Sequence, residues 1–266
     1  MSRHAHRVRP AAVAGVFYPG AATELGRRVD ALLAVAARTA PAGPVPKALI
    51  VPHAGYDYSG PIAASGYVRV APSRGRIRRV VLLGPAHRVG FSGLALPDAD
   101  ALLTPLGAVR AGGADLPGVF ADPRPHAEEH SLEVHLPFLQ RVLGDVEVVP
   151  LLVGDAPAEE VARTLDALWG GDETLIVVSS DLSHYHSDDV AQVIDAGSAA
   201  QIEALGPMLH HEQACGATPV NGLLVAAKRR GMRVERLDLR NSGDTAGSRE
   251  RVVGYGAFAF HEGGAR

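Results

Sequence analysis

Thr174-Leu175-Ile176-Val177-Val178 is a continuous apolar run that stops where the polar residues Ser179-Ser180-Asp181 begin. Three other runs in the 266-residue chain have the same character: residues 47–51 (Lys-Ala-Leu-Ile-Val), residues 80–83 (Val-Val-Leu-Leu) and residues 146–153. Short apolar runs of this kind are typical of parallel strands that are buried on both faces. The four runs therefore predict the central strands of a layered sheet.

Stretches with the hydrophobic period of a helix lie between these runs and beyond them. They cover residues 22–37, 59–70, 128–142, 158–169, 190–205 and 219–230. Two later segments, residues 234–239 and 253–260, are typical of strands, and the second is expected to close the sheet. The alternation predicts an α/β fold: a single domain over residues 1–266 with a central, mostly parallel or mixed β-sheet flanked by helices. Residues 1–9 are expected to form a loose tail.

Composition excludes several classes of function. The formal net charge is −3, with no run of like charge, so we expect neither nucleic acid nor a membrane surface as a partner. A single cysteine rules out a fold built on disulfides. The apolar patch near the N-terminus is interrupted by Tyr18-Pro19-Gly20, too early for a signal or membrane helix. We therefore expect a cytoplasmic protein.

Histidines follow three of the predicted strands within a few residues. His53 follows the run at 47–51, His87 follows the run at 80–83, and His184 and His186 follow the run at 174–178. In doubly wound sheets ligands bind at the carboxyl ends of the strands, so these side chains are expected to converge there. A single histidine of this kind would be read as a surface residue, but three indicate a site. Neutral imidazoles suit iron, zinc and copper, so the pattern predicts a metal centre.

Cys215 is the leading candidate for a further ligand. It lies just before a predicted helix, whose N-terminus favours a thiolate. The alternative is a small buried apolar residue. Asp181 and His184 form a second unit, in which the carboxylate is expected to orient the imidazole for metal binding or for general acid/base work. A helix-capping role is the alternative for Asp181.

Residues 128–137 (Glu-Glu-His-Ser-Leu-Glu-Val-His-Leu-Pro) carry a third polar cluster. In a helix, Glu129 and Glu133 would share one face, and His130 and Glu133 would be neighbours. We expect a structural or substrate-facing role for His130 and Glu133, with direct metal ligation as the alternative. Pro137 is expected to bend or end the helical stretch.

Nine motifs, in this order, resemble the Memo family, whose bacterial members are called AmmeMemoRadiSam system protein B. They are AGVFYPG, VPHAGYDYSG, LLGPAHR, TPLG, EEHSLEVHLPFL, VPLLVG, VVSSDLSHY, CGATPVNGLL and NSGDTAG with VVGYGAF. The resemblance covers nearly the whole chain. The family is similar in fold to the class III extradiol dioxygenases, which are non-haem iron enzymes that open catechol rings.

The resemblance implies a specific site. The metal ligands would be His53, His87 and Cys215, with Asp181 and His184 lining the same pocket. His130, Glu133 and Tyr56 are expected beside the pocket or behind its ligands. The cysteine stands where the dioxygenases use a glutamate, and a soft thiolate shifts metal preference toward copper or zinc. The resemblance also implies a functional link to a radical SAM protein.

The leading hypothesis is therefore a redox or dioxygenase-like enzyme with one mononuclear metal ion, iron first, with copper or zinc as alternatives. His184 would move protons, and a small molecule or a peptide would occupy the cleft. The alternative is a non-catalytic protein that uses the same cleft to bind metal or a ligand. A third hypothesis is metal-free hydrolysis through Cys215 and His184.

Overall fold

Four adjacent parallel strands form the centre of the sheet in the computed structural model, which describes residues 7–40, 43–113, 116, 118–206 and 208–263. They are β8 (Glu147–Val153), β3 (Arg79–Pro85), β9 (Thr174–Ser179) and β2 (Ala48–Val51), in that spatial order. Each coincides with all or nearly all of one of the four apolar runs. Their side chains alternate between two buried clusters, one on each face of the sheet. Burial on both faces explains why these strands are apolar throughout.

The remaining strands extend the sheet in both directions. Beyond β2 lies the antiparallel β12 (Val252–His261), which pairs with β11 (Arg233–Asn241) and β10 (His184–His186). On the other side, the sheet continues from β8 through β6 (Gly107–Ala111) and β5 (Ala101–Thr104) to β1 (Val8–Arg9). Two short strands, β4 (Leu94–Leu96) and β7 (Val119–Ala121), pair beside β8. The described residues thus form one mixed sheet of 12 strands, which confirms the predicted fold class.

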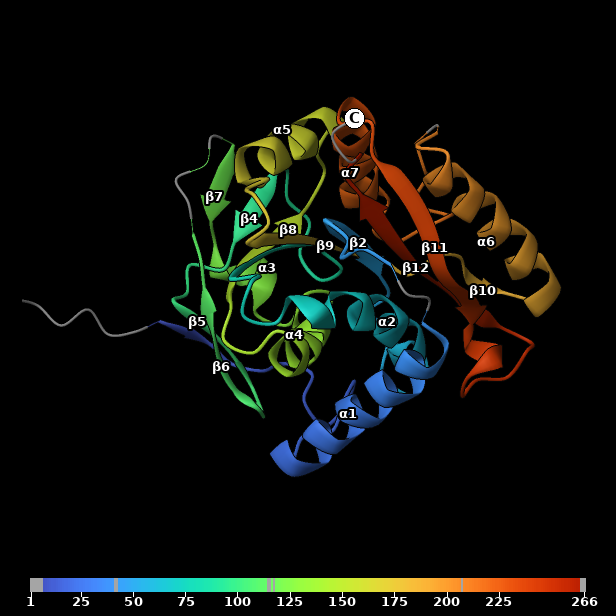
Figure 1. Cartoon of the computed structure of the whole chain (residues 1–266), viewed down its shortest axis with the longest axis horizontal. Helices are drawn as coiled ribbons and strands as arrows, with labels where there is room; N and C mark the ends of the chain where they lie inside the picture. Colours follow the sequence, from blue (N-terminus) through green and yellow to red (C-terminus); the bar gives the residue numbers. More distant parts are fainter. Residues whose placement is uncertain (1–6, 41–42, 114–115, 117, 207, 264–266) are drawn as a thin grey trace, which may run out of the picture.

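Helices cover both faces of this sheet (Figure 1). On one face lie α1 (Ala22–Thr39), α2 (Gly60–Tyr67) and α4 (Leu136–Val142), and on the other α5 (Ala158–Leu168), α6 (Asp188–Glu203) and α7 (Ala217–Arg229). The short elements are α3 (Pro123–His126) and the 3₁₀ turns η1 (Val68–Ser73), η2 (Glu133–His135) and η3 (Ser242–Asp244). Within the described ranges, no helix combines the length and the apolar character needed to cross a bilayer.

Parallel pairing brings three strand ends to one edge of the sheet. Val51 at the end of β2 is in register with Ser179 at the end of β9, and Leu83 of β3 is in register with Val178. The segments that follow these strands carry His53, His87 and the loop from Asp181 to His184. The topology therefore places the predicted histidines together, as a site at strand ends requires.

The segment from residue 128 to 132 is not the helix that we expected. Glu129 Oε1 accepts hydrogen bonds from the backbone N–H groups of His130 and Ser131, both at 2.9 Å. A side chain that binds neighbouring N–H groups competes with the helical pattern, so the helix begins only at Leu136. Pro137 lies in the first turn of α4, where its missing N–H is not needed, rather than ending a helix.

The N-terminal expectation also needs correction. Residues 1–6 lie outside the described residues, but Val8 and Arg9 form β1, which pairs with β5. Arg9 is buried and forms an ion pair with Glu133. The tail predicted for residues 1–9 is therefore wrong at its C-terminal end, because a buried charge fixes that part of the chain.

Candidate metal centre

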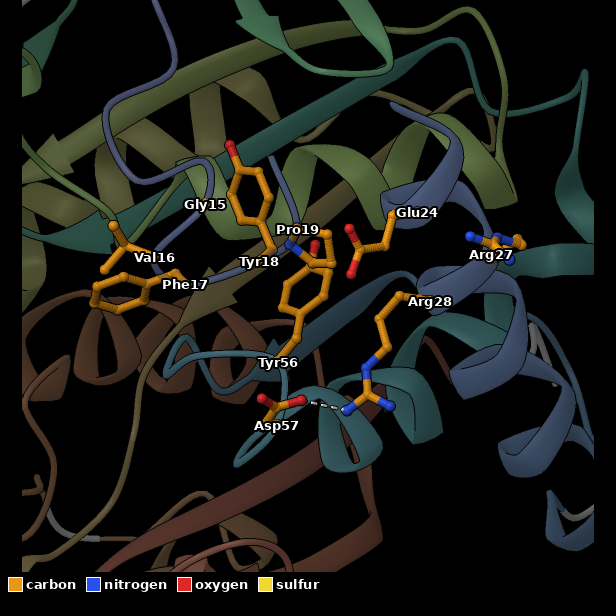
Figure 2. Close-up of a pocket in the computed structure, with 10 residues that line it drawn as sticks. All are labelled: Gly15, Val16, Phe17, Tyr18, Pro19, Glu24, Arg27, Arg28, Tyr56 and Asp57. Carbon is orange, nitrogen blue, oxygen red and sulfur yellow. Dashed lines mark hydrogen bonds and ion pairs between the residues drawn. The ribbon is translucent and has the colours of Figure 1, made fainter. Parts of the chain in front are cut away.

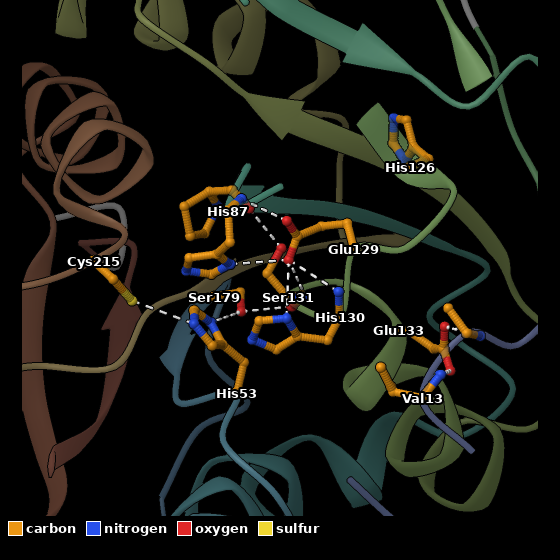
Figure 3. A network of polar contacts seen from close by, with 12 residues as sticks. Val13, His53, His87, His126, Glu129, His130, Ser131, Glu133, Ser179 and Cys215 are labelled. Carbon is orange, nitrogen blue, oxygen red and sulfur yellow. Dashed lines mark hydrogen bonds and ion pairs between the residues drawn. The ribbon is translucent and has the colours of Figure 1, made fainter. Parts of the chain in front are cut away.

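Three side chains from distant parts of the sequence meet at the strand-end edge. His53 follows β2, His87 follows β3, and Cys215 precedes α7. One donor atom from each lies within 4.8 Å of the others. Figure 3 shows the two imidazoles and the sulfur facing one another. The strand-end argument predicts that the two imidazoles meet here, and Cys215 reaches the same point from the turn before α7.

The distance between the sulfur and His53 suits a single ion. The Cys215 sulfur lies 3.3 Å from Nε2 of His53. Two ligands held at about 2.1 Å and about 2.3 Å from one metal ion are at most about 4.4 Å apart. The set also combines soft sulfur with borderline nitrogen, which suits iron, copper and zinc better than magnesium or calcium. The residues present therefore fit a transition-metal ion.

His87 is oriented by a buried carboxylate. Its Nδ1 lies 2.9 Å from Glu129 Oε1, and its backbone N–H donates to Glu129 Oε2. Burial alone would raise the pKa of Glu129, but hydrogen bonds from His87 and from Ser131 lower it to about 2. A carboxylate with this pKa accepts only, so Nδ1 of His87 carries the proton and Nε2 is free for a ligand role.

Glu129 also belongs to a second group of close donor atoms, with His87 and His130. Its Oε1 already accepts from His87 Nδ1 and from two backbone N–H groups, all at 2.9 Å. A metal ion here would have to displace these bonds. We therefore interpret Glu129 as the residue that holds the loop and His87 in place. His130 stacks on His87 with ring centroids 4.7 Å apart, and burial lowers the pKa of His130 to about 4.

Cys215 differs in one respect from the prediction. Burial raises the pKa of the Cys215 thiol, and the nearby charge of Asp181 raises it further. The helix N-terminus does not overcome these effects, so the metal-free protein holds a thiol rather than the expected thiolate. The sulfur contacts His53 Nε2 and the backbone oxygen of Asp181. A bound cation would supply the charge that favours deprotonation.

Asp181 and His184 do not form the pair that we expected. Asp181 Oδ1 accepts a hydrogen bond of 2.7 Å from the backbone N–H of His53, and burial raises the pKa of Asp181 to about 6. His184 Nδ1 instead lies 2.8 Å from the backbone oxygen of Leu182. Because a carbonyl oxygen only accepts, Nδ1 of neutral His184 carries the proton and Nε2 can accept one. Leu182, not Asp181, orients this ring.

A pocket of about 760 Å³ opens beside the three candidate ligands. Tyr185 lies at its rim as the extra residue of a bulge between β10 and β12, with φ of 63° and an exposed ring. Bulges and left-handed residues of this kind often re-aim side chains near functional sites. His186 also lines the pocket and is half-buried. The other polar or aromatic lining residues include Phe17, Arg88, His130, Asp181, His184 and His211.

Neither Glu133 nor Tyr56 lines this pocket. Glu133 pairs with Arg9 and accepts from the Tyr18 hydroxyl at 2.6 Å. The Tyr56 hydroxyl donates to the backbone oxygen of Val134 at 2.6 Å. Tyr56 lines a different hollow of about 550 Å³, beside the ion pair of Arg28 with Asp57 (Figure 2). In the expected helix, Glu133 would have been a neighbour of His130. Because residues 128–132 are not helical, the two side chains are not brought together in this way.

Residues behind the ligands were missed by the sequence argument. Ser179 Oγ lies 2.6 Å from His53 Nδ1 and 2.8 Å from His135 Nε2. Ser179 is the first polar residue after the run at 174–178, so the strand-end rule that found the histidines applies to it as well. Glu129 gave no comparable signal, because its contact with His87 spans 42 residues of sequence.

Comparison with known proteins gives one consistent result. The family described as Memo-like protein matches residues 9–259. A MEMO1 family protein of Aquifex aeolicus is 34% identical over 275 residues, which cover 96% of this chain and 99% of the relative. A MEMO1 family protein of Ignicoccus hospitalis is 34% identical over 287 residues, with 95% and 98% covered. The similarity therefore extends over nearly the full length of both proteins in each pair.

Proposed function

Since the chain belongs to the Memo-like protein family, we propose that it is a metal-binding protein that holds one ion through His53, His87 and Cys215. The observation that carries the proposal is the convergence of two imidazoles and the only cysteine of the chain at one point. Two features add support. The donor set of sulfur and nitrogen suits a transition-metal ion. In both histidines, Nδ1 is held by a second residue, Ser179 for His53 and Glu129 for His87, which orients the ring.

We propose iron as the resident ion, with copper and then zinc as alternatives. The resemblance to non-haem iron enzymes favours iron, whereas the thiol in place of a glutamate favours the softer ions. When bound, such an ion would supply Lewis-acid or one-electron redox chemistry to a molecule in the adjoining pocket. The function is then that of an oxidoreductase related in type to the dioxygenases.

The chain's own residues have separate tasks in this proposal. His184 acts as the general base or acid, because Leu182 fixes its proton on Nδ1 and leaves Nε2 available at the pocket wall. Asp181 holds the backbone at His53 through its 2.7 Å hydrogen bond. Arg88 lines the same pocket and adds a positive charge there. Phe17 and Tyr185 give the pocket an aromatic wall on which a planar ligand could pack.

The alternative is a protein that binds metal or a ligand without turnover. A saturated site of four protein ligands would favour it. Within the described residues, three side chains form the group around the Cys215 sulfur, and a pocket of about 760 Å³ adjoins it. These observations favour an enzyme. Metal-free hydrolysis through Cys215 and His184 receives less support, because the sulfur contacts His53 and burial raises the pKa of the thiol.

The test uses protein purified without oxygen, analysed for metal and then loaded with Fe²⁺. Oxygen consumption is followed with catechols and other small phenols for the wild type and for His184→Gln. The variant should keep its iron and lose about 10²–10⁴-fold in oxygen-dependent turnover, the usual contribution of a positioned proton-transfer group. Loss of iron together with activity would make His184 a ligand. No oxygen consumption by the iron-loaded wild type would reject ring cleavage and favour the binding protein.

A further inference from the structure

We propose that Ser179, supported by His135, is a positioning residue that fixes the tautomer of His53 and so keeps Nε2 of His53 available as a ligand. The inference rests on the proposed metal site, but it concerns the metal-free protein. All three residues are buried, so water does not offer them alternative partners. The number of hydrogens available among four neighbouring groups fixes their hydrogen-bond directions.

The Ser179 hydroxyl has one hydrogen and three neighbours. Its oxygen lies 2.7 Å from the backbone oxygen of Ser131, 2.6 Å from Nδ1 of His53 and 2.8 Å from Nε2 of His135. The carbonyl oxygen of Ser131 can only accept. If the hydroxyl donated elsewhere, two oxygens with facing lone pairs would lie 2.7 Å apart in a buried place. The hydrogen of Ser179 therefore points at Ser131.

The tautomers of both histidines follow from this assignment. Since the Ser179 hydrogen is committed, its oxygen accepts from both rings, so Nδ1 of His53 and Nε2 of His135 each carry a proton. In neutral His53, Nε2 is then left with a lone pair, and it is this atom that lies 3.3 Å from the Cys215 sulfur. The thiol can donate to it when no metal is bound. When a metal is bound, the same lone pair becomes the ligand.

His135 completes the arrangement from behind. It is 1% exposed, and burial lowers its pKa to about 3, so the ring stays neutral near pH 7. With His53 and Ser131 it fills all three hydrogen-bonding positions of the Ser179 hydroxyl, which fixes the direction of that hydroxyl. Among the described residues, His135 hydrogen-bonds to Ser179 and its ring packs against Tyr67, and neither of these is a candidate ligand. Its effect on the metal therefore passes through Ser179.

The same pattern recurs at two other rings that line the pocket, those of His87 and His184. Glu129 takes the Nδ1 proton of His87, and the Leu182 carbonyl takes that of His184. Each uses an acceptor that cannot donate. Ser179 is the exception, because a hydroxyl can donate as well, and the Ser131 carbonyl removes that ambiguity. Three different acceptors thus hold the proton on Nδ1 and leave Nε2 of each ring with a lone pair.

The direct test is ¹⁵N NMR of the imidazole rings in the metal-free protein, because protonated and unprotonated ring nitrogens resonate far apart. In the wild type, His53 should carry its proton on Nδ1 and His135 on Nε2. Ser179→Ala should leave His53 as a mixture of tautomers or place the proton on Nε2. Finding His53 protonated on Nε2 in the wild type would overturn the proposal, whatever the variants do.

Metal binding supplies the second readout, with Co²⁺ as the spectroscopic probe. Ser179→Ala should weaken Co²⁺ binding by about 10–100-fold, the usual effect of losing a partner behind a ligand. Ser131→Ala is the matched control: it removes a buried hydroxyl that donates to Pro85, but keeps the carbonyl that Ser179 needs. The control should keep both the tautomers and the affinity.

The outcomes separate this inference from the proposed function. Equal losses of Co²⁺ affinity in Ser179→Ala and Ser131→Ala, with unchanged tautomers, would reduce Ser179 to a structural residue. A wild type that shows the stated tautomers but binds neither Co²⁺ nor Fe²⁺ would reject the metal site while leaving the tautomer assignment intact. If Ser179→Ala does not fold, the wild-type ¹⁵N spectrum alone decides the assignment, because His53 protonated on Nε2 would overturn it.

Discussion

Two buried carboxylates, four residues apart in one segment, have opposite roles in this protein. Glu133 is surrounded by the Arg9 guanidinium, two backbone N–H groups and the Tyr18 hydroxyl. Glu129 faces the ring of His87 and three backbone N–H groups. Both carboxylates are 2% exposed. Burial alone therefore does not separate a structural group from a functional one.

The two carboxylates differ in the further contacts that their partners, Arg9 and His87, make. Arg9 donates onward to the backbone oxygens of His126 and Glu129, so the Glu133 network closes on itself inside the protein. His87 has a second nitrogen, which faces Cys215 and His53 beside an open pocket. A buried carboxylate whose partners are a cation and backbone N–H groups holds segments of the chain together. A buried carboxylate that accepts from one nitrogen of an imidazole orients the ring and leaves its other nitrogen free to bind a metal.

The largest effect is expected at the ligands themselves. Cys215→Ala and His53→Ala should each weaken Fe²⁺ or Co²⁺ binding by more than about 100-fold, the upper end for residues that act only from behind a ligand. Calorimetric or spectroscopic titration under nitrogen measures it. His210→Ala, an exposed histidine outside the pocket, is the control. Equal metal affinity in all three variants would contradict the proposed metal centre.

The next effect belongs to the Glu133 network and should appear in stability. Arg9→Met leaves the Glu133 carboxylate buried without its cation, which typically costs about 3–5 kcal/mol of unfolding free energy. Denaturant unfolding measures the loss. Adding Glu133→Gln should recover part of it, because the uncompensated charge disappears. A loss below about 1 kcal/mol would mean that the pair behaves like a surface salt bridge. Metal affinity of the folded variant should stay near that of the wild type.

The smallest effect distinguishes the two carboxylates directly. Glu129→Gln places an amide where His87 needs an acceptor, so metal affinity should fall by about 10–100-fold. Glu133→Gln, the matched change four residues away, should lower the free energy of unfolding and leave metal affinity within a few-fold of the wild type. Reversed results, with metal affinity sensitive to Glu133 and not to Glu129, would contradict the assignment of roles.

The central sheet could be predicted from the sequence because its strands are buried on both faces. The runs at 47–51, 80–83, 146–153 and 174–178 correspond to β2, β3, β8 and β9. The strand-end rule then brought His53, His87 and His184 to one edge. Local patterns suffice here, because apolar continuity and the parallel topology do not depend on individual side-chain contacts.

The parts that failed depend on contacts between distant residues. β4 to β7 are short, and several of their residues are exposed, so they give no continuous apolar run. The segment at 128–132 has the period of a helix, but Glu129 binds the N–H groups of His130 and Ser131 instead. Arg9 looked like part of a tail because its partner Glu133 is 124 residues away. No local pattern contains these pairings.

X-ray absorption at the iron edge, on protein loaded with Fe²⁺ without oxygen, tests the central claim most directly. The three-residue centre predicts one sulfur at about 2.3 Å and at least two nitrogens at about 2.0–2.1 Å around one iron. The sulfur signal should vanish in Cys215→Ala, which removes the only cysteine of the chain. An iron surrounded by nitrogen and oxygen alone in the wild type, with the thiol still free, would contradict the centre formed by His53, His87 and Cys215.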